Sequence, residues 1–167
     1  NQATIGGSIY GRFGFSDVLT AFLALDTFVE LYDGGTIRLS EFVNRKPDKD
    51  ILLSVIVRKS KRKFRYASIR QTKTDFPVIA CSVVTGMVHG KETWYFSVGA
   101  RPMKAALLER QWEIPADVSE AMIADYAGQA ASEFTYGSNM RGSAEYRRHL
   151  AEVLIRREMT SILAEGR

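Results

Sequence analysis

The sequence of 167 residues has few of the side chains on which disulfides and metal sites depend. Cys81 is the only cysteine, which excludes an intramolecular disulfide and a thiolate cluster for zinc or iron–sulfur. His89 and His149 are the only histidines, and they lie far apart in the sequence. Ser-His-Asp and Cys-His constellations are missing as well. We therefore expect no metal ligands, no catalytic residues of the chain's own, and a reducing, cytoplasmic location.

Long hydrophobic runs and a strong charge bias are also missing. No apolar run approaches the roughly 20 residues needed to cross a bilayer, so we expect no membrane contact. The formal net charge is +4, which permits an anionic partner but does not require nucleic acid. Hydrophobic residues make up 46 % of the chain and charged residues 25 %, which is typical of a globular protein with a core.

The first 60 residues predict a glycine turn, one helix and a few strands. The turn is the glycine pair of "ATIGGSI", and Ser16 is the expected N-cap of a helix over "FSDVLTAFLALD". Residues 28–39 alternate like a hairpin around a turn at Asp33-Gly34-Gly35. "LSEFV" suits a single helical turn, and the β-branched run "ILLSVIV" predicts a strand. These elements have no evident way to close a core alone.

Residues 61–167 predict three antiparallel strands followed by helices. The strands are "KFRYASIRQ", "PVIACSVVTGMV" and "TWYFSVGAR". After Pro102 we expect only helices: the short "MKAALLERQW", one that starts at Pro115, and a long last helix capped by Ser143. This order indicates an α+β fold, with a three-stranded antiparallel sheet packed on a helical bundle. We expect this part to fold autonomously.

Basic residues are concentrated in "RKSKRK" at positions 58–63. The simpler interpretation is a solvated edge that keeps a strand from pairing wrongly. Nucleic-acid contact is the weaker alternative, since no aromatic side chains interleave with the charges. Arg141, Arg147 and Arg148 either dock a neighbouring subunit or cap and solvate the last helix, and the second interpretation is favoured. Cys81 lies in an apolar run and is expected to be an inert core residue.

Two stretches of the sequence resemble one protein family. "ATIGGSI" is followed, nine positions after Ser8, by Asp17 in "SDVLTAFLALD", and "MRGSAEYRRHLAEVLIRR" stands near the C-terminus. With "ILLSVIV", "FRYASIRQ" and "PVIACSVV" between them, they are similar to the flavoprotein subunit of the molybdenum hydroxylases. That family includes xanthine dehydrogenase and carbon monoxide dehydrogenase. The resemblance covers essentially the whole chain.

The resemblance implies two parts. Residues 1–60 would be the C-terminal, incomplete portion of a vanillyl-alcohol-oxidase-type FAD-binding domain. Residues 61–167 would be a domain like the C-terminal domain of the carbon monoxide dehydrogenase flavoprotein. In the family two glycine loops clamp the FAD pyrophosphate, and this sequence has a counterpart of only the second, Thr-Ile-Gly-Gly-Asn. The chain looks like a protein cut inside its FAD domain, or a naturally split one. We expect FAD in the full-length protein but not in these 167 residues alone.

Cofactor-binding residues follow from the resemblance one by one. Glycines let backbone N–H groups approach phosphate oxygens. Asp17 matches an aspartate suited to a ribityl hydroxyl, Leu52 a leucine that touches the flavin, and Arg70 a basic residue, usually lysine, near the flavin. Ser8 replaces the usual asparagine, and both departures could shift flavin affinity or potential. The expected FAD-binding set is Thr4, Ile5, Gly6, Gly7, Ser8, Asp17, Leu52 and Arg70.

On the residues alone, simpler interpretations stay open. The glycine pair is then a plain turn, Asp17 is a carboxylate at a helix start, and Arg70 is a cation on the solvated end of a strand.

The function that the resemblance implies is electron transfer. Substrate would be hydroxylated on a molybdopterin-binding large subunit, electrons would pass through a [2Fe–2S] small subunit, and FAD would hand them to an acceptor such as NAD. A homodimer is a further expectation. Because the first glycine loop is missing, the alternative is a cofactor-free subunit-interaction or scaffold module. A nucleic-acid module rests only on "RKSKRK" and the basic composition and is weaker still.

Overall fold

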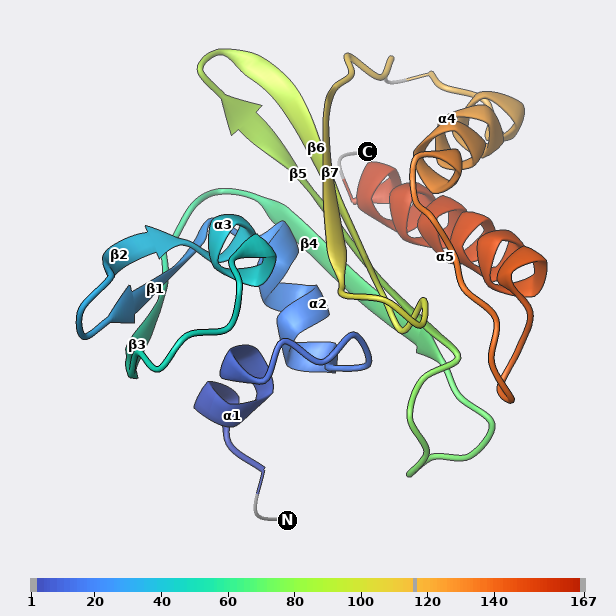
Figure 1. The fold of residues 1–167 in the computed structure, drawn as a ribbon. Coiled ribbons are helices and arrows are strands. Elements are labelled where there is room, and N and C mark those ends of the chain that lie inside the picture. The colour runs from blue at the N-terminus through green and yellow to red at the C-terminus, as the bar shows by residue number, and fades with distance from the viewer. Residues whose placement is uncertain (1–2, 116, 166–167) are drawn as a thin grey trace.

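The computed structural model describes residues 3–115 and 117–165 of the chain. Its elements in chain order are α1 (Ile5–Tyr10), α2 (Asp17–Ala24), β1 (Thr27–Leu31), β2 (Gly35–Arg38), α3 (Leu39–Asn44), β3 (Leu52–Val57), β4 (Lys63–Ile69), β5 (Ile79–Val88), β6 (Lys91–Gly99), β7 (Ala106–Gln111), α4 (Glu120–Ser132) and α5 (Ala144–Ala164). They form two antiparallel sheets: sheet A in the order β2-β1-β3 and sheet B in the order β4-β5-β6-β7. The predicted α+β class is confirmed (Figure 1).

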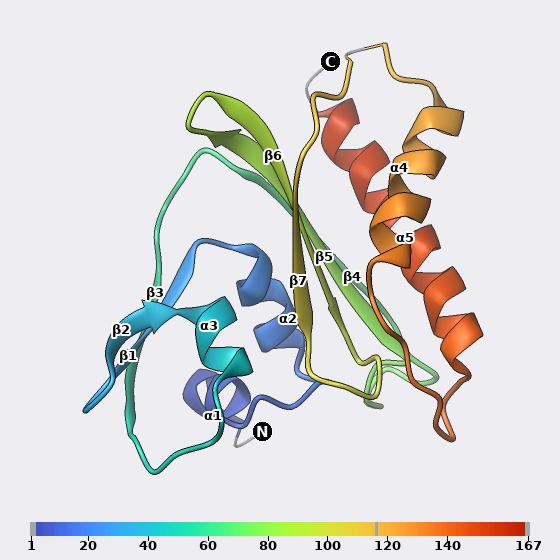
Figure 2. The ribbon, with the colours of Figure 1, turned by 45° about the horizontal axis from the view of Figure 1, so that its top comes forward.

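Sheet B is covered on both faces (Figure 2). Helices α4 and α5 pack on one face, and α2, from the N-terminal part of the chain, packs on the other against β5 and β6. None of the helices within the described residues has the length and apolarity required to span a bilayer.

The N-terminal glycine pair was expected to form a turn, and that prediction is wrong. Gly6 and Gly7 lie in α1, which begins after Thr4. The Thr4 hydroxyl accepts a hydrogen bond from the Gly7 N–H at 3.0 Å, and the Ser8 N–H donates to the Thr4 carbonyl at 3.0 Å. This N-cap supplies the first helical turn with acceptors, so the glycines take helical rather than turn geometry. The predicted cap of α2 is confirmed, because the Ser16 hydroxyl accepts from the Leu19 N–H at 3.2 Å.

Sheet A packs on a core of its own, here called core A. Alternate residues of β1 are buried, as a half-covered strand requires. The predicted hairpin turn is held by Asp50, whose carboxylate accepts the N–H groups of Asp33 at 2.9 Å and Gly34 at 2.8 Å. These hydrogen bonds hold the pKa of Asp50 below its usual value. The buried members of core A are Ile9, Leu19, Leu23, Val29, Leu31, Leu39, Phe42, Val43 and Ala105.

Sheet B has four strands, whereas the sequence predicted three. The segment "MKAALLERQW" was expected to be helical, but residues 106–111 form β7 and pair with β6 in the register Val98↔Ala106 to Thr93↔Gln111. Ala, Leu, Glu and Arg favour helix locally, and the pairing with a neighbouring buried strand outweighs a preference of a few tenths of a kcal/mol per residue. The helix expected from Pro115 is also corrected: α4 begins at Glu120, and its cap is Ser119.

The two faces of sheet B contribute different side chains where helices pack on them. Large residues of β5 and β6 face α4 and α5 in the main core, among them Val83, Trp94 and Phe96. Strand alternation places the small residues Ser82 and Ser97 on the face toward α2, where both are fully buried. Small side chains on that face allow α2 to lie close to the sheet.

Arg147 is the largest departure from the predicted surface. It was expected to dock a subunit or to solvate the last helix, but it is 1 % exposed. Its Nε donates to the Val78 carbonyl at 2.9 Å, Nη1 donates to the carbonyls of Gly137 (2.9 Å) and Gly142, and Nη2 donates to Asn139 Oδ1 at 2.5 Å. The guanidinium therefore ties the loop before α5 to the start of β5.

The predictions for Arg148, Ser143 and Cys81 agree with the structure. Arg148 is exposed, as favoured, and Ser143 caps α5 by accepting from the Tyr146 N–H at 3.1 Å. Cys81 is buried in the main core, and burial raises the pKa of its thiol, as expected for an inert residue.

Limited proteolysis is expected to cut first between about Asn44 and Lys63. The loops on either side of β3, residues 45–51 and 58–62, are mostly exposed and contain basic residues for trypsin. The nicked chain should still elute as one species, because β3 stays hydrogen-bonded to β1. Mass spectrometry of the first fragments checks this. A first cut inside α5, at the exposed Arg156 or Arg157, would contradict it.

Candidate functional site

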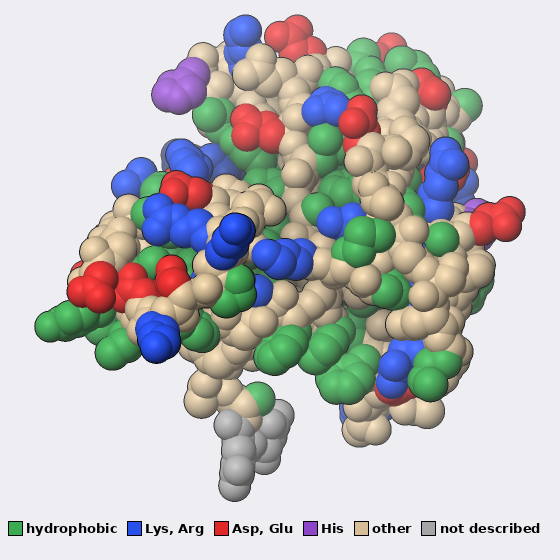
Figure 3. Space-filling view, viewed as in Figure 1, with side chains coloured by type: hydrophobic (Ala, Val, Ile, Leu, Met, Phe, Trp, Pro, Cys, Tyr) green, Lys and Arg blue, Asp and Glu red, His purple; other side chains and the backbone are tan. Residues whose placement is uncertain are grey.

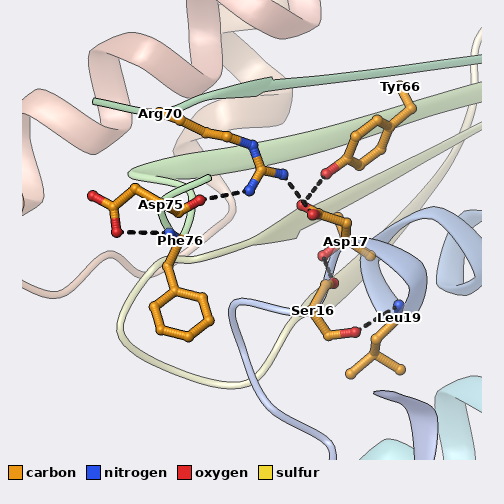
Figure 4. Close-up of polar contacts among 8 residues, drawn as sticks. Ser16, Asp17, Leu19, Tyr66, Arg70, Asp75 and Phe76 are labelled. Atoms are coloured by element: carbon orange, nitrogen blue, oxygen red, sulfur yellow. Dashed lines mark hydrogen bonds and ion pairs between the residues drawn. The ribbon is translucent and has the colours of Figure 1, made fainter. Parts of the chain in front are cut away.

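Three polar side chains from distant parts of the sequence meet where α2 begins. Asp17 is the first residue of α2, Tyr66 lies in β4, and Arg70 directly follows β4. Arg70 Nη2 lies 2.5 Å from Asp17 Oδ2, and the Tyr66 hydroxyl donates to Asp17 Oδ1 at 2.5 Å (Figure 4). Both oxygens of the carboxylate thus have a donor. Arg70, which on the residues alone was a cation on the solvated end of a strand, follows β4 as expected, but its side chain is 25 % exposed and paired with Asp17.

The electrostatics of this cluster keep Tyr66 and Arg70 in their hydrogen-donating forms. Burial raises the pKa of Tyr66, and the Asp17 carboxylate raises it further, so the phenol remains a donor. The hydrogen bond that Arg70 donates to Asp17 also raises the pKa of Arg70. The Asp17 side chain is nevertheless 41 % exposed. Since each carboxylate oxygen has two lone pairs, Asp17 can accept a further hydrogen bond from a ligand hydroxyl.

Arg70 also orders the loop between β4 and β5. Its Nη1 donates to the Asp75 carbonyl at 2.8 Å. The Asp75 carboxylate in turn accepts from the Phe76 N–H at 2.7 Å and from Arg141 Nη2 at 3.2 Å. In Figure 4 the Phe76 ring extends from the Asp75 end of this network toward the side on which Ser16 lies. The network fixes the loop that carries Phe76.

A hollow of about 410 Å³ lies beside this network, within the range of small-molecule sites. Its aromatic wall is exposed: Phe15 and Phe76 lie 4.3 Å apart between ring centroids and are 41 % and 51 % exposed. Arg141 lies over the Phe76 ring at 5.6 Å, and its buried Nε has no hydrogen-bond partner among the described residues. The lining residues are Gly14, Phe15, Phe76, Pro77, Ala100, Pro102, Met103, Asn139, Arg141 and Arg147.

Sequence reasoning did not single out this aromatic wall. The available signal was the position of Phe15 and Phe76 in loops, "RFGF" and "TDFP", outside any apolar period. An aromatic residue in a loop lies outside the hydrophobic periodicity that marks core positions, and it is therefore a candidate for ligand contact. Whether such a residue is exposed depends on the fold and cannot be read from the sequence.

The predicted α1 residues form a second group. A Cβ at Gly6 would meet nothing within 4 Å, so the backbone there is open to an approaching ligand. A Cβ at Gly7 would meet the capping Thr4 hydroxyl at 3.1 Å. Ile5 is 56 % exposed, and Ser8 is half-buried. The open backbone at Gly6 fits a phosphate-bearing group.

Leu52 lies near the α1 group. Helix α1 packs on β3, where Leu52 is half-buried against core A, and Tyr10 donates to the Asp50 carbonyl at 2.8 Å. Helix α1 also packs on α2. Among the described residues, no hydrogen bond joins residues 4–8 to Asp17 or Arg70. The predicted set is therefore divided between two neighbouring groups. The described part of the chain has no cluster of three or more His, Cys, Asp or Glu that could hold a metal ion.

Comparison with known proteins gives one family. Residues 62–162, more than half of the chain, match the model of the CO dehydrogenase flavoprotein C-terminal domain. No curated protein matches the sequence.

Solved structures match over nearly the whole chain. Quinoline 2-oxidoreductase from Pseudomonas putida 86 matches with a TM-score of 0.80 and 16 % identity, over 99 % of this chain and 62 % of its own. Reconstituted CO dehydrogenase from Oligotropha carboxidovorans matches with 0.75 and 19 %, over 97 % and 61 %. Carbon monoxide dehydrogenase from Hydrogenophaga pseudoflava, in a form that lacks the Mo-pyranopterin moiety, matches with 0.77 and 16 %, over 98 % and 62 %. At these identities the likeness shows the fold, and the chain spans about three fifths of each matched chain.

Proposed function

We propose, from the premise that this chain belongs to the family of the CO dehydrogenase flavoprotein C-terminal domain, that it is part of the FAD-binding subunit of a molybdenum hydroxylase. In the complete enzyme, electrons reach FAD from iron–sulfur clusters and leave to an acceptor such as NAD, in the manner of xanthine dehydrogenase. FAD supplies the redox chemistry when bound, and the protein supplies binding and orientation.

The two groups of proposed binding residues would hold different parts of the cofactor. Thr4, Ile5, Gly6, Gly7 and Ser8 would hold the pyrophosphate. The hydroxyls of Thr4 and Ser8 and the backbone at Gly6 would make the contacts, because no side chain shields Gly6, whereas the N–H groups of Gly7 and Ser8 already donate to Thr4.

The remaining residues would hold the rest of the cofactor. Asp17 would accept from a ribityl hydroxyl, while Leu52 and Arg70 would lie against the flavin. The exposed rings of Phe15 and Phe76 add a flat apolar surface suited to a planar ring.

The observation that carries the proposal is the fixed Asp17 carboxylate. A ligand hydroxyl finds Asp17 already oriented by Tyr66 and Arg70, so no side-chain freedom is lost when it binds. Tyr66 is thus a positioning residue in this proposal.

The partners proposed for this subunit are a molybdopterin-binding large subunit and a [2Fe–2S] small subunit, with a homodimer as a further contact and the cytoplasm as location. Co-expression of the full-length protein with its genomic neighbours tests this proposal. We expect visible flavin absorbance and co-purification of a molybdenum or iron–sulfur partner. Purification with neither would overturn the assignment.

Replacement of Asp17 by asparagine in the full-length flavoprotein is expected to weaken FAD binding by about tenfold. One charge-assisted hydrogen bond is worth about 1.5–3 kcal/mol, and 1.4 kcal/mol corresponds to a factor of ten. Titration of the cofactor-depleted protein with FAD measures the affinity. The matched control is Asp125→Asn, which removes an exposed carboxylate that bonds only to Gln129 on α4. Equal affinities in the two variants would show that Asp17 serves only the structure, through the start of α2 and its pairing with Tyr66 and Arg70.

A cofactor-free interaction module is the second candidate. It is favoured by the mutual pairing of Asp17, Tyr66 and Arg70, which leaves no charge of this cluster in need of a ligand. Reading the coding sequence upstream of Asn1 separates the two candidates. An in-frame Ala-Gly-Gly-Thr-like loop supports the flavoprotein, and a start codon at this point supports the interaction module.

A further inference from the structure

A second hollow, of about 620 Å³, lies at the opposite end of α2 from Asp17. We call it the junction cleft, because sheet A, the β5–β6 hairpin and the 58–62 linker all line it. Leu25 and Asp26 mark the C-terminal end of α2, and eight helical residues rise by about 12 Å, so the cleft is separate from the Asp17 cluster. Its lining residues are Leu23, Leu25, Asp26, Thr27, Arg38, Leu39, Ser40, Arg58, Arg62, Val88, His89, Tyr95, Leu107 and Glu109.

Three guanidinium groups converge on the junction cleft, each set over an aromatic ring. Arg58 and Arg38 lie over Phe28, with their Cζ atoms 4.2 and 5.1 Å from its centroid. Arg62 lies over Tyr95 at 4.8 Å. Figure 3 shows Lys and Arg side chains gathered over this side of the molecule, between sheet A and the β5–β6 hairpin. The rings hold the guanidinium planes in place, and the N–H edges of Arg58 and Arg62 stay free to bind.

The acidic side chains of the cleft pair with Arg38 but leave Arg58 and Arg62 unneutralised. Asp26 pairs with Arg38 at 3.3 Å. The side chains of Arg58 and Arg62 form no ion pair or hydrogen bond with any residue that the structure describes. Glu109 also lines the cleft and, like burial, raises the pKa of Tyr95, an effect that Arg62 opposes. Arg58 and Arg62 are therefore the two cations of the cleft whose charge a bound anion would neutralise.

We propose that the junction cleft binds a phosphoryl group carried by a small molecule, with Arg58 and Arg62 as its main ligands. Planar guanidinium groups bind phosphate through paired hydrogen bonds. The leucines of the cleft, Leu23, Leu25, Leu39 and Leu107, give the rest of the ligand an apolar floor. The volume suits a nucleotide or smaller.

The cleft also explains the basic run that the proposed function leaves without a role. Arg58 and Arg62 of "RKSKRK" line the cleft, whereas Lys59 and Lys61 are exposed and do not. Lys63 donates to the Ile162 carbonyl at 3.0 Å and so anchors the run to α5. The run therefore separates into residues that face a cavity and residues that face water.

Calorimetric titration of the full-length protein with inorganic pyrophosphate and with ADP, at low ionic strength, tests the proposal. The double variant Arg58→Gln/Arg62→Gln should bind both probes at least about tenfold more weakly, since each charge-assisted contact is worth about 1.5–3 kcal/mol. The matched control Lys59→Gln/Lys61→Gln removes the same charge from the same linker and should change affinity less than about twofold, because exposed charges are screened. Tighter binding of ADP than of pyrophosphate identifies a nucleotide, and equal binding identifies the phosphoryl group alone. Both support the cleft.

A second variant keeps the test valid if the arginine variant does not fold. Glu109→Gln removes a carboxylate from the cleft and should tighten pyrophosphate binding severalfold while leaving the thermal midpoint unchanged. The proposal is overturned if the wild-type chain binds neither probe at millimolar concentration. It is also overturned if both double variants lose affinity equally, including for a short DNA duplex, because the run would then act only as a solvated surface charge.

Discussion

Arg147→Met is expected to lower the free energy of unfolding by about 3–5 kcal/mol, because each polar group left buried without a partner costs about 1–3 kcal/mol. The guanidinium donates to three carbonyls and to Asn139, and methionine donates to none. Methionine fills most of the volume, so the loss reports on the hydrogen bonds rather than on a cavity. Domains of this size have a total stability of about 5–15 kcal/mol, so a large part of it depends on this side chain.

Urea denaturation followed by circular dichroism measures the loss for Arg147→Met. Arg148→Met is the matched control, because the neighbouring residue is exposed, and it should change stability by less than about 0.5 kcal/mol. Arg147→Lys should fall between the two, since an ammonium group reaches fewer of the acceptors. A change below about 1 kcal/mol for Arg147→Met would show that water satisfies the loop carbonyls equally well.

Gly99→Ala is expected to destabilise the chain by about 3 kcal/mol, at the upper end of the range for overpacking. A Cβ at position 99 would collide with the Thr20 hydroxyl of α2 and approach the Gly14 carbonyl to 3.0 Å. That carbonyl accepts from the Ala100 N–H at 2.5 Å and cannot move without breaking this hydrogen bond. The substitution would therefore push α2 away from sheet B.

A double-mutant cycle attributes the effect of Gly99→Ala to the contact with α2. Thr20→Ala removes the colliding hydroxyl, so the double variant should recover part of the loss, with a coupling energy of about 1 kcal/mol or more. Gly128→Ala is the control in α4, where a Cβ would meet nothing closer than Glu152 at 3.9 Å. It should be neutral or slightly stabilising. Additive effects of Gly99→Ala and Thr20→Ala would rule out the collision as the cause.

The sequence predicted those elements whose signals are local. The hydroxyls of Ser16 and Ser143 cap α2 and α5 as expected, because a cap needs only a side chain and an N–H three residues on. The strands of sheet A and the first three of sheet B were found because their β-branched and alternating residues fit a pleated, half-buried surface. Their observed bounds differ from the prediction by one or two residues.

What the sequence did not predict depends on partners far away in the chain. Strand β7 has the composition of a helix, and only its pairing with β6 makes it a strand. The burial of Arg147 depends on carbonyls up to 69 positions away. No window of the sequence contains both partners of such a contact, so charge alone placed Arg147 on the surface.

In the candidate site, too, the contacts between residues far apart in the chain were not predictable from local sequence signals. The resemblance named Asp17 and Arg70, and the structure pairs them with each other, although they are 53 positions apart. Tyr66, the second donor to the Asp17 carboxylate, was missed because a tyrosine in an alternating strand has no distinguishing local signal. Their role toward FAD stays a proposal.

The position of α2 between core A and sheet B has a consequence for how this protein can evolve. A segment that is exchanged between genes must contain the elements that cover its own buried faces. A segment cut at residue 61 would keep the four strands of sheet B and lose the helix that covers one of their faces. Recombination at that border would join the sheet face that carries Ser82 and Ser97 to a helix selected for another partner. We infer that α2 and the face of sheet B that it covers are constrained to change together, although they lie on opposite sides of the border at which the family domain of residues 62–162 begins.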